Sequence, residues 1–224
     1  MTSIRNPRRT TSSVIAQLSD DLHPVRRLWQ PRTRLLVWLG VQVSVLFAAL
    51  LLFGVRGDSD TKLQQVPFAA ELVALAAIAI MTALLALRAA VPGREPRVGI
   101  TLGLLAVIVS LLAGRYAAEP SLSASTHEFI AMGWPCALRA LAVAGIPWIA
   151  ILVAIRRGAT LVAVTAGVLG GAASFFFAAL TLRLACSLDD NWHLIVWHLG
   201  PVVIGLTASA VLGRLWLARW RRAR

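Results

Sequence analysis

The chain has 224 residues, of which 58% are hydrophobic and only 14% are charged, and its formal net charge is +12. Soluble domains keep roughly a quarter of their residues charged, so this composition excludes an ordinary soluble protein and indicates an integral membrane protein. The length allows about six membrane spans of about 20 residues with short loops, which leaves no room for a separate soluble catalytic domain.

Six apolar segments follow one another along the chain, and each is long enough to cross the hydrocarbon core of a bilayer as a helix. Backbone polar groups in lipid must be satisfied within the segment, which favours helices over strands. We therefore predict an all-α, polytopic membrane protein. Its expected spans are residues 35–55, 68–87, 98–114, 133–155, 159–182 and 192–213.

Arginine is distributed unequally between the loops. The two tails and the second and fourth loops hold most of the arginines, whereas the odd-numbered loops hold most of the loop carboxylates. Positively charged loops stay in the cytoplasm, so both termini are predicted to be cytoplasmic. The basic residues thus indicate topology rather than direct contact with nucleic acid. The expected division is a tail at 1–33, a six-helix domain at 34–214 and a basic tail at 215–224.

The N-terminal tail is predicted to form one short amphipathic helix, with N-caps at Thr11 to Ser13 and a stop at Pro24. Its apolar side chains project within about a 100° arc, and the tail has no core in which to bury them. This stripe therefore needs a partner, which could be the bilayer surface or a groove on a cytoplasmic protein. The stripe consists of Val14, Ile15, Leu18 and Leu22, continued by Val25, Leu28 and Trp29.

The chain has two cysteines, Cys136 and Cys186, and no C-x-x-C motif. In the predicted topology both lie at the outer face, at neighbouring ends of the fourth and fifth helices. Pro135 is expected to place Cys136 at a helix N-terminus, which favours the thiolate. Arg139 and Arg183, each three residues from one cysteine, favour it too, whereas burial opposes it.

Other polar side chains fall at the same depth, namely Glu71, His193 and His198. Three interpretations stay open: a permanent disulfide, an ion pair between Glu71 and Arg139, and a redox or metal sensor that uses both thiols. The two histidines are five residues apart, or about 140° around an α-helix, so they are not expected to share one metal ion.

Two further features concern the sixth helix. Pro201 would free the Trp197 carbonyl and kink the helix, which makes a structural role for His198 as reasonable as a ligand role. Asp189 and Asp190 are expected to cap its N-terminus. Gly167 and Gly171 form a small-x-x-x-small pair, which predicts close helix packing within the chain. The sequence has no Walker loop, no H-E-x-x-H and no G-x-S-x-G, so no enzymatic activity is expected.

Several short stretches of the chain form a recognisable set. They are Asp21-Leu22-His23-Pro24-Val25-Arg26-Arg27-Leu28 with Pro31, then Cys136, Cys186, Trp197-His198 and Pro201. Together they resemble the NrsF (negative regulator of sigma-F) family of bacterial membrane anti-sigma factors. The resemblance implies a multi-pass protein of the bacterial inner membrane that holds an extracytoplasmic-function sigma factor inactive. It also implies that the tail stretch, including Asp21 and Pro24, contributes to sigma binding, and that the two cysteines respond to oxidative or heavy-metal stress.

The resulting hypothesis is an anti-sigma factor whose tail stripe binds sigma and whose sensor is Cys136 with Cys186. Arg139, Arg183, Glu71, His193 and His198 would support the sensor. No permanent cofactor is expected, and a thiophilic metal ion at the two cysteines is the one transient ligand predicted. Two alternatives remain: a small transporter or metal-handling protein that uses the same polar cluster, and a structural subunit with a permanent disulfide. The sequence leaves the oligomeric state open.

Overall fold

The computed structural model describes residues 11–20, 28–97 and 125–218, together with Gly99, Gly103, Ala106, Ser110 and Gly114. Every regular element in these residues is a helix, in agreement with the predicted all-α class. The predicted tail helix is present as α1 (Thr11–Asp20), which starts at the expected cap residues and leaves Ile15 59% exposed. The side chain of Leu18 and residues 21–27, which include Asp21, Leu22, Pro24 and Val25, lie outside the described part.

Five helices of the described part are long and apolar enough to cross a membrane. Each overlaps one of the predicted spans, and a short helix, α3 (Ser59–Leu63), joins the first two. The fifth is a composite in which two π-helical turns, η1 and η2, interrupt the α-helix. The five are α2 (Pro31–Phe53), α4 (Val66–Ala89), α6 (Thr126–Arg156), α7 (Ala163–Ala185) and the composite of α8 (Asn191–His193), η1 (Leu194–Leu199), α9 (Gly200–Leu212) and η2 (Gly213–Leu217).

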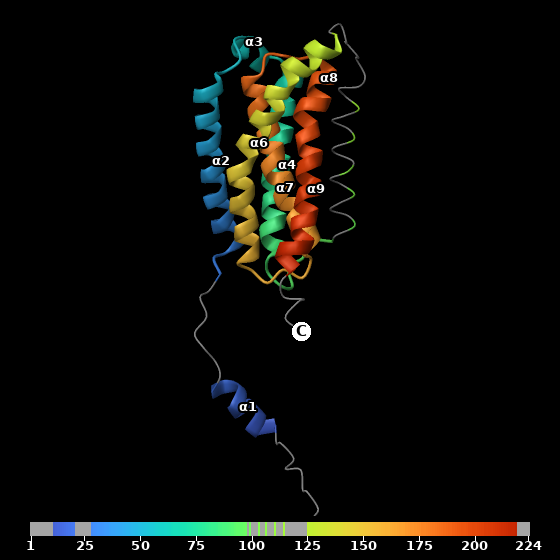
Figure 1. Cartoon of the computed structure of the whole chain (residues 1–224). Coiled ribbons are helices and arrows are strands. Elements are labelled where there is room, and N and C mark those ends of the chain that lie inside the picture. Colours follow the sequence, from blue (N-terminus) through green and yellow to red (C-terminus); the bar gives the residue numbers. More distant parts are fainter. Residues whose placement is uncertain are drawn as a thin grey trace, which may run out of the picture.

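The sequence predicted six spans, and the described residues contain five. The missing third span, predicted at 98–114, falls almost entirely outside the described part, where only the five isolated residues named above have an assigned, helical backbone. α4 ends and α6 begins at opposite ends of the bundle (Figure 1).

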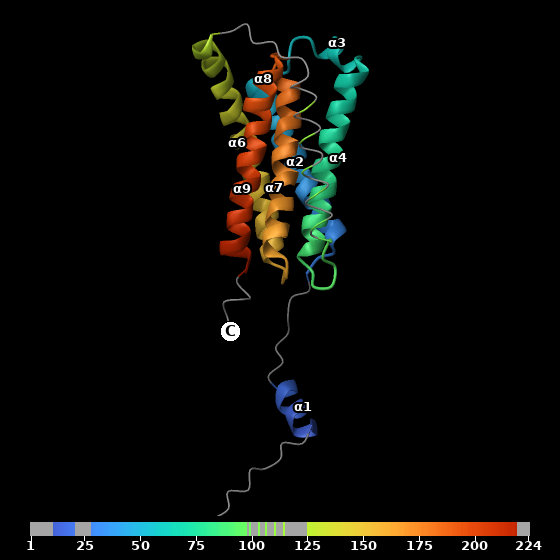
Figure 2. The ribbon, with the colours of Figure 1, turned by 90° about the vertical axis from the view of Figure 1, so that its right-hand side faces the viewer.

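The long helices run side by side as a bundle (Figures 1 and 2). α3 and α8 lie at one end, called here the α3–α8 end. The opposite end is called the tail end, because the N-terminal segment joins α2 there and η2 finishes there (Figure 1). The chain thus enters and leaves the bundle on the same side, as predicted, while the assignment of that side to the cytoplasm stays a prediction.

α7 is the central helix of the bundle. Of its most apolar stretch, 83% is buried inside the protein, and α7 packs against α4, α6 and α9. The contact with α9 requires small residues, since a Cβ atom on Gly167 would lie 2.5 Å from the Ser209 carbonyl oxygen and one on Gly171 would overlap the Ser209 hydroxyl. The Gly167 and Gly171 pair therefore serves packing within the chain, as predicted.

Two side chains hold the start of α2 against α6 near the tail end. The buried guanidinium of Arg34 donates to the carbonyl of Ala154. The indole N–H of Trp38 donates to the carbonyl of Pro147 at 3.1 Å, and Pro147 lies inside α6. The helix into which the tail leads is thus fixed to the second half of α6.

We expect Gly171→Ala to lower the free energy of unfolding by about 1–3 kcal/mol, the usual cost of overpacking a tight contact, because the new methyl group would push α9 away from α7. Gly145→Ala is the matched control: Gly145 also lies in a long helix, but no described atom comes within 4 Å of a Cβ there. That control should be neutral or slightly stabilising, since alanine favours helices. Unfolding curves in detergent micelles measure both, and equal effects would contradict this account of the α7–α9 contact.

Candidate functional site

The two cysteines meet at the α3–α8 end of the bundle. Both are buried free thiols, and their sulfur atoms lie 3.7 Å apart. Cys186 is the C-cap of α7, and its backbone N–H donates to the carbonyl of Leu182 at 2.7 Å. The sequence predicted both cysteines at one end of the bundle and left their contact open. In the structure Cys136, from α6, lies against Cys186 at the end of α7.

The local setting of Cys136 differs from the prediction. α6 starts at Thr126 rather than at Pro135, because the N-cap Ser125 and Glu128 in the first turn form a capping box. Cys136 therefore lies inside a helix, and the expected support of its thiolate by a helix N-terminus is wrong. Pro135 instead removes one backbone hydrogen bond from the interior of α6.

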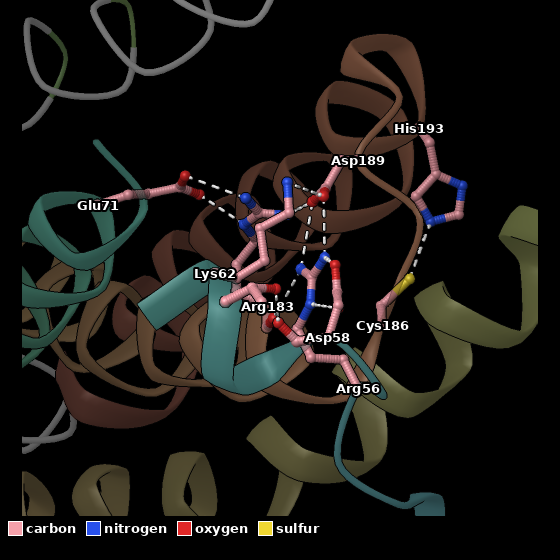
Figure 3. Close-up of polar contacts among 9 residues, drawn as sticks. Arg56, Asp58, Lys62, Glu71, Arg183, Cys186, Asp189 and His193 are labelled. Atoms are coloured by element: carbon pink, nitrogen blue, oxygen red, sulfur yellow. Dashed lines mark hydrogen bonds and ion pairs between the residues drawn. The ribbon is translucent and has the colours of Figure 1, made fainter. Parts of the chain in front are cut away.

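Two histidines complete a compact cluster around the thiols. The Nε2 atom of His193 lies 3.7 Å from the sulfur of Cys186 (Figure 3). One ligand-type atom from each of Cys136, Cys186, His193 and His198 can be chosen so that all four lie within 4.8 Å of one another, and all four residues are buried. The cluster formed by these four residues is called the Cys–His cluster below.

The two histidines were expected to point about 140° apart around the helix, and this expectation is wrong. Their ring centroids are 5.4 Å apart. The physical reason is the π turn η1 that separates them: a π-helix bonds residue i to residue i+5, and the N–H of Gly200 donates to Ile195 in this way. Residues five apart then stack about one turn above each other, whereas an α-helix would have separated them.

An aromatic side chain shields the Cys–His cluster. Trp197 packs against the group formed by Cys136, Ala140, Leu182 and Cys186, and its ring lies 5.6 Å from that of Phe129. Gly133 makes room for it, since a Cβ at this position would overlap the indole. The absence of a side chain at Gly133 therefore lets the Trp197 indole pack over the two thiols.

A group of ion pairs fills the neighbouring part of the α3–α8 end. Arg183 binds Glu71 with two nitrogens, at 2.8 and 3.3 Å, and Asp189 with a third at 2.8 Å (Figure 3). The side chain of Glu71 is 1% exposed and that of Arg183 is 7% exposed. This arrangement corrects two predictions, because Glu71 pairs with Arg183 rather than with Arg139, and Arg183 faces carboxylates rather than the thiol of Cys186.

Arg56 and Lys62 extend the ion pairs to the connection between α2 and α4. Arg56 contacts Asp58 at 2.6 Å and Asp189 at 2.8 Å, and Lys62 contacts Asp189 at 2.6 Å. The guanidinium carbons of Arg56 and Arg183 lie 5.2 and 4.9 Å from the centre of the Phe68 ring, which adds cation–π attraction. Three cations and three carboxylates thus neutralise one another; with Phe68 they are called the ion network.

The ion network shifts the titration of its members that lie outside the helical spans. Burial raises the pKa of Asp189, but hydrogen bonds from Arg56, Lys62 and Arg183 outweigh it, and the net pKa is well below the usual aspartate range. The hydrogen bond from Arg56 lowers the pKa of Asp58 as well. Asp189 and Asp58 are therefore both charged at neutral pH.

The other residues predicted for the site separate into different roles. Asp190 caps the last span by accepting from the backbone N–H of His193 at 2.9 Å, as expected, whereas Asp189 belongs to the ion network instead. Arg139 lies over the ring of Phe53, 5.0 Å from its centre. Sequence reasoning also missed Arg56, Phe68 and the shielding by Trp197, since contacts between distant helices leave no trace in local spacing.

The geometry allows two kinds of chemistry at the Cys–His cluster. Two sulfurs at 3.7 Å are close enough to form a disulfide after a small movement, because the bonded distance is about 2.05 Å. The same sulfurs with two imidazoles are also the donor types that soft divalent metal ions prefer. Either event would join α6 to the connection between α7 and α8.

We expect Arg183→Gln to lower the free energy of unfolding by about 3–5 kcal/mol, because it removes the opposite charge from a buried carboxylate. Lys62→Gln removes a more exposed partner of Asp189 and should cost about 0–1 kcal/mol. Adding Glu71→Gln to the Arg183 variant should restore part of the loss, since it removes the unbalanced charge. Unfolding in detergent measures all three variants, and similar losses for Arg183 and Lys62 would contradict the importance given to burial.

One family of known proteins matches this chain. No significant match was found among curated proteins or among solved structures. One family model, NrsF, described as "Negative regulator of sigma F", matches residues 18–220. The match covers the part of the tail that follows Leu18, all of the helices that form the bundle, and the Cys–His cluster. The chain therefore belongs to the NrsF family of negative regulators of sigma F.

Proposed function

We propose that this protein is an anti-sigma factor of the bacterial inner membrane that holds an extracytoplasmic-function sigma factor inactive and releases it under oxidative or heavy-metal stress. The family match supports the regulation of a sigma factor. The five apolar helices support a membrane location. The observation that carries the sensing part of the proposal is the buried contact between the sulfurs of Cys136 and Cys186 at 3.7 Å.

The tail supplies the sigma-binding element in this proposal. α1 is amphipathic, and Ile15 is exposed on it with no hydrophobic core to enter. An amphipathic helix binds a partner by laying its apolar face into a groove. The stripe of Val14, Ile15, Leu18, Leu22, Val25 and Leu28, with Asp21 and Pro24, would bind sigma on its polymerase-binding surface and so block transcription.

The Cys–His cluster supplies the switch. A two-electron oxidant such as a hydroperoxide would take two electrons and two protons from the thiols, leaving a disulfide, an alcohol and water. A disulfide typically changes a conformational equilibrium by about 2–4 kcal/mol, which corresponds to roughly a thirtyfold to several-hundredfold shift in population. The bond can favour the sigma-releasing state only by the difference in its stability between the two states.

The transporter alternative would use the polar side chains at the α3–α8 end as a translocation path. Glu71 is the carboxylate on which it depends most, and Glu71 is held inside the bundle by an ion pair and one hydrogen bond to Arg183. This pairing supports a structural role for Glu71. The anti-sigma proposal, which needs no mobile carboxylate, therefore fits the contacts better.

The tail is tested with the full-length protein reconstituted in lipid nanodiscs and the sigma factors of the same organism, in reducing buffer. We expect Ile15→Asp to weaken sigma binding by about 2 kcal/mol or more, roughly thirtyfold in Kd, because it places a charge in the apolar contact. Ala16→Asp adds the same charge on the other side of α1 and is the matched control. Equal binding by both variants and the unchanged protein would rule out the stripe as the sigma contact.

The sensor is tested in cells with a reporter gene driven by the cognate sigma factor. We expect Cys136→Ser and Cys186→Ser to retain repression but to lose induction by a hydroperoxide or by cadmium, because neither a disulfide nor a dithiolate can form. Membrane abundance of each variant is measured alongside. A variant that is present at normal level and still induces fully would contradict the proposal, and lowered stability without a changed response would indicate a structural disulfide instead.

A further inference from the structure

The Cys–His cluster has the donor set and the burial of a metal site. Its four donors come from three places in the chain: α6 for Cys136, the end of α7 for Cys186, and the α8–η1 segment, in which His193 ends α8 and His198 lies within η1. All four side chains are buried. Residues from separate elements thus bring four ligand atoms within 4.8 Å of one another.

Two distances within the cluster match those between ligands of one tetrahedral ion. With metal–sulfur bonds of about 2.3 Å and metal–nitrogen bonds of about 2.05 Å, tetrahedral angles give about 3.8 Å between two sulfurs and about 3.6 Å between sulfur and nitrogen. The structure has 3.7 Å between the sulfurs of Cys136 and Cys186 and 3.7 Å between Cys186 Sγ and His193 Nε2. These donors are therefore already spaced for an ion.

His198 provides an independent observation. It is only 2% exposed, and among the described residues neither of its ring nitrogens has a hydrogen-bond partner. A buried polar group without a partner is costly, and such groups call for a bound ion or another explanation. A metal ion at the Cys–His cluster would accept the lone pair of one ring nitrogen and so remove the part of that cost that belongs to this nitrogen.

The donor set also selects the class of ion. Two sulfurs and two imidazoles favour zinc and cadmium over magnesium and calcium, which require oxygen ligands. No carboxylate belongs to the cluster within the described residues. Two thiolates would neutralise a divalent ion, so the bound set carries no net charge into a buried site.

We propose that Cys136, Cys186, His193 and His198 form a closed, four-coordinate site for one soft divalent cation of the zinc and cadmium class. On binding, the two thiols each lose a proton to solvent, and the neutral imidazoles each donate one nitrogen lone pair. The site has no open position, so it serves binding rather than catalysis. The bound ion and the disulfide need the same two sulfurs, and the ion therefore protects the thiols from oxidation. This inference deepens the proposed function and rests on it for its biological meaning, but the ligand set rests on geometry alone.

The test uses the full-length, reduced protein in detergent micelles and cobalt(II) as a spectroscopic probe. We expect one equivalent to bind with the visible absorption of tetrahedral cobalt and a sulfur-to-metal charge-transfer band, and one equivalent of zinc to abolish both. His193→Ala and His198→Ala should each weaken binding by at least about tenfold, since loss of even an indirect partner of a ligand has that effect. His127→Ala, on an exposed histidine at the start of α6, is the matched control and should bind like the unchanged protein.

Protection of the thiols provides the second measurement. Zinc should slow modification of Cys136 and Cys186 by a maleimide in the unchanged protein and in the His127 variant, but much less in either ligand variant. If a ligand variant unfolds, His193→Gln or His198→Gln replaces it. Binding that is equally tight without His193 and His198 would overturn the four-ligand site and leave a dithiolate, and octahedral cobalt spectra would overturn it as well.

The two proposals fail separately. A protein that binds sigma through its tail but takes up no tetrahedral ion would overturn the metal site alone. A protein that binds cobalt as described, but whose tail captures no sigma factor, would overturn the proposed function and leave the site intact.

Discussion

The arrangement of the α3–α8 end depends on the charged guanidinium of Arg183, which is buried near the C-terminal end of α7. α7 is the central helix, and an arginine at such a position is tolerated only if opposite charges come to it. Glu71 arrives from α4 and Asp189 from the connection between α7 and α8, and both bind Arg183. Asp189 in turn attracts Arg56 and Lys62 from the connection between α2 and α4.

The position of Cys186 follows from this constraint. It lies three residues beyond Arg183, at the point where α7 ends, so the ion network fixes the end of the helix that carries it. The backbone N–H of Arg56 also donates to the Leu184 carbonyl at 3.0 Å, which ties the α2–α4 connection to the same turn. The thiol therefore has a defined position relative to α6, and contact with Cys136 is the result. The ion network thus helps to hold the two thiols of the neighbouring Cys–His cluster in contact.

The sequence was sufficient to predict the all-α class and the five spans found among the described residues, because apolar segments of span length have few alternatives in lipid. It was also sufficient to bring Cys136 and Cys186 to one end, since this follows from the order of the helices. The boundaries were less accurate. Pro135 suggested a helix start, but the capping box of Ser125 and Glu128 gives the true one, and that signal was present in the sequence.

The side-chain contacts of the site could not be predicted from the ideal α-helical spacing of 3.6 residues per turn. The two histidines were expected to diverge because 3.6 residues per turn were assumed throughout, and η1 breaks that assumption between them. Pro201 was the available signal, since a residue that cannot donate a backbone hydrogen bond favours irregular turns just before it. The choice of Arg183 over Arg139 as the partner of Glu71 depends on how α4 rotates against α7, and spacing along one helix carries no information on that rotation.

The two attachments of α2 to α6 have a mechanical consequence. Cys136 and Ala154 lie 18 positions apart on one helix, or about 27 Å at 1.5 Å per residue, so a single rod runs from the thiols to the place where Arg34 is held. Pro147 interrupts the backbone hydrogen bonds of this rod at the same residue whose carbonyl holds Trp38. A displacement of Cys136 would accordingly bend α6 near Pro147, where Trp38 of α2 is hydrogen-bonded to it. A movement of the Cys136 sulfur would thus change the angle between α6 and the start of α2, where the tail joins the bundle.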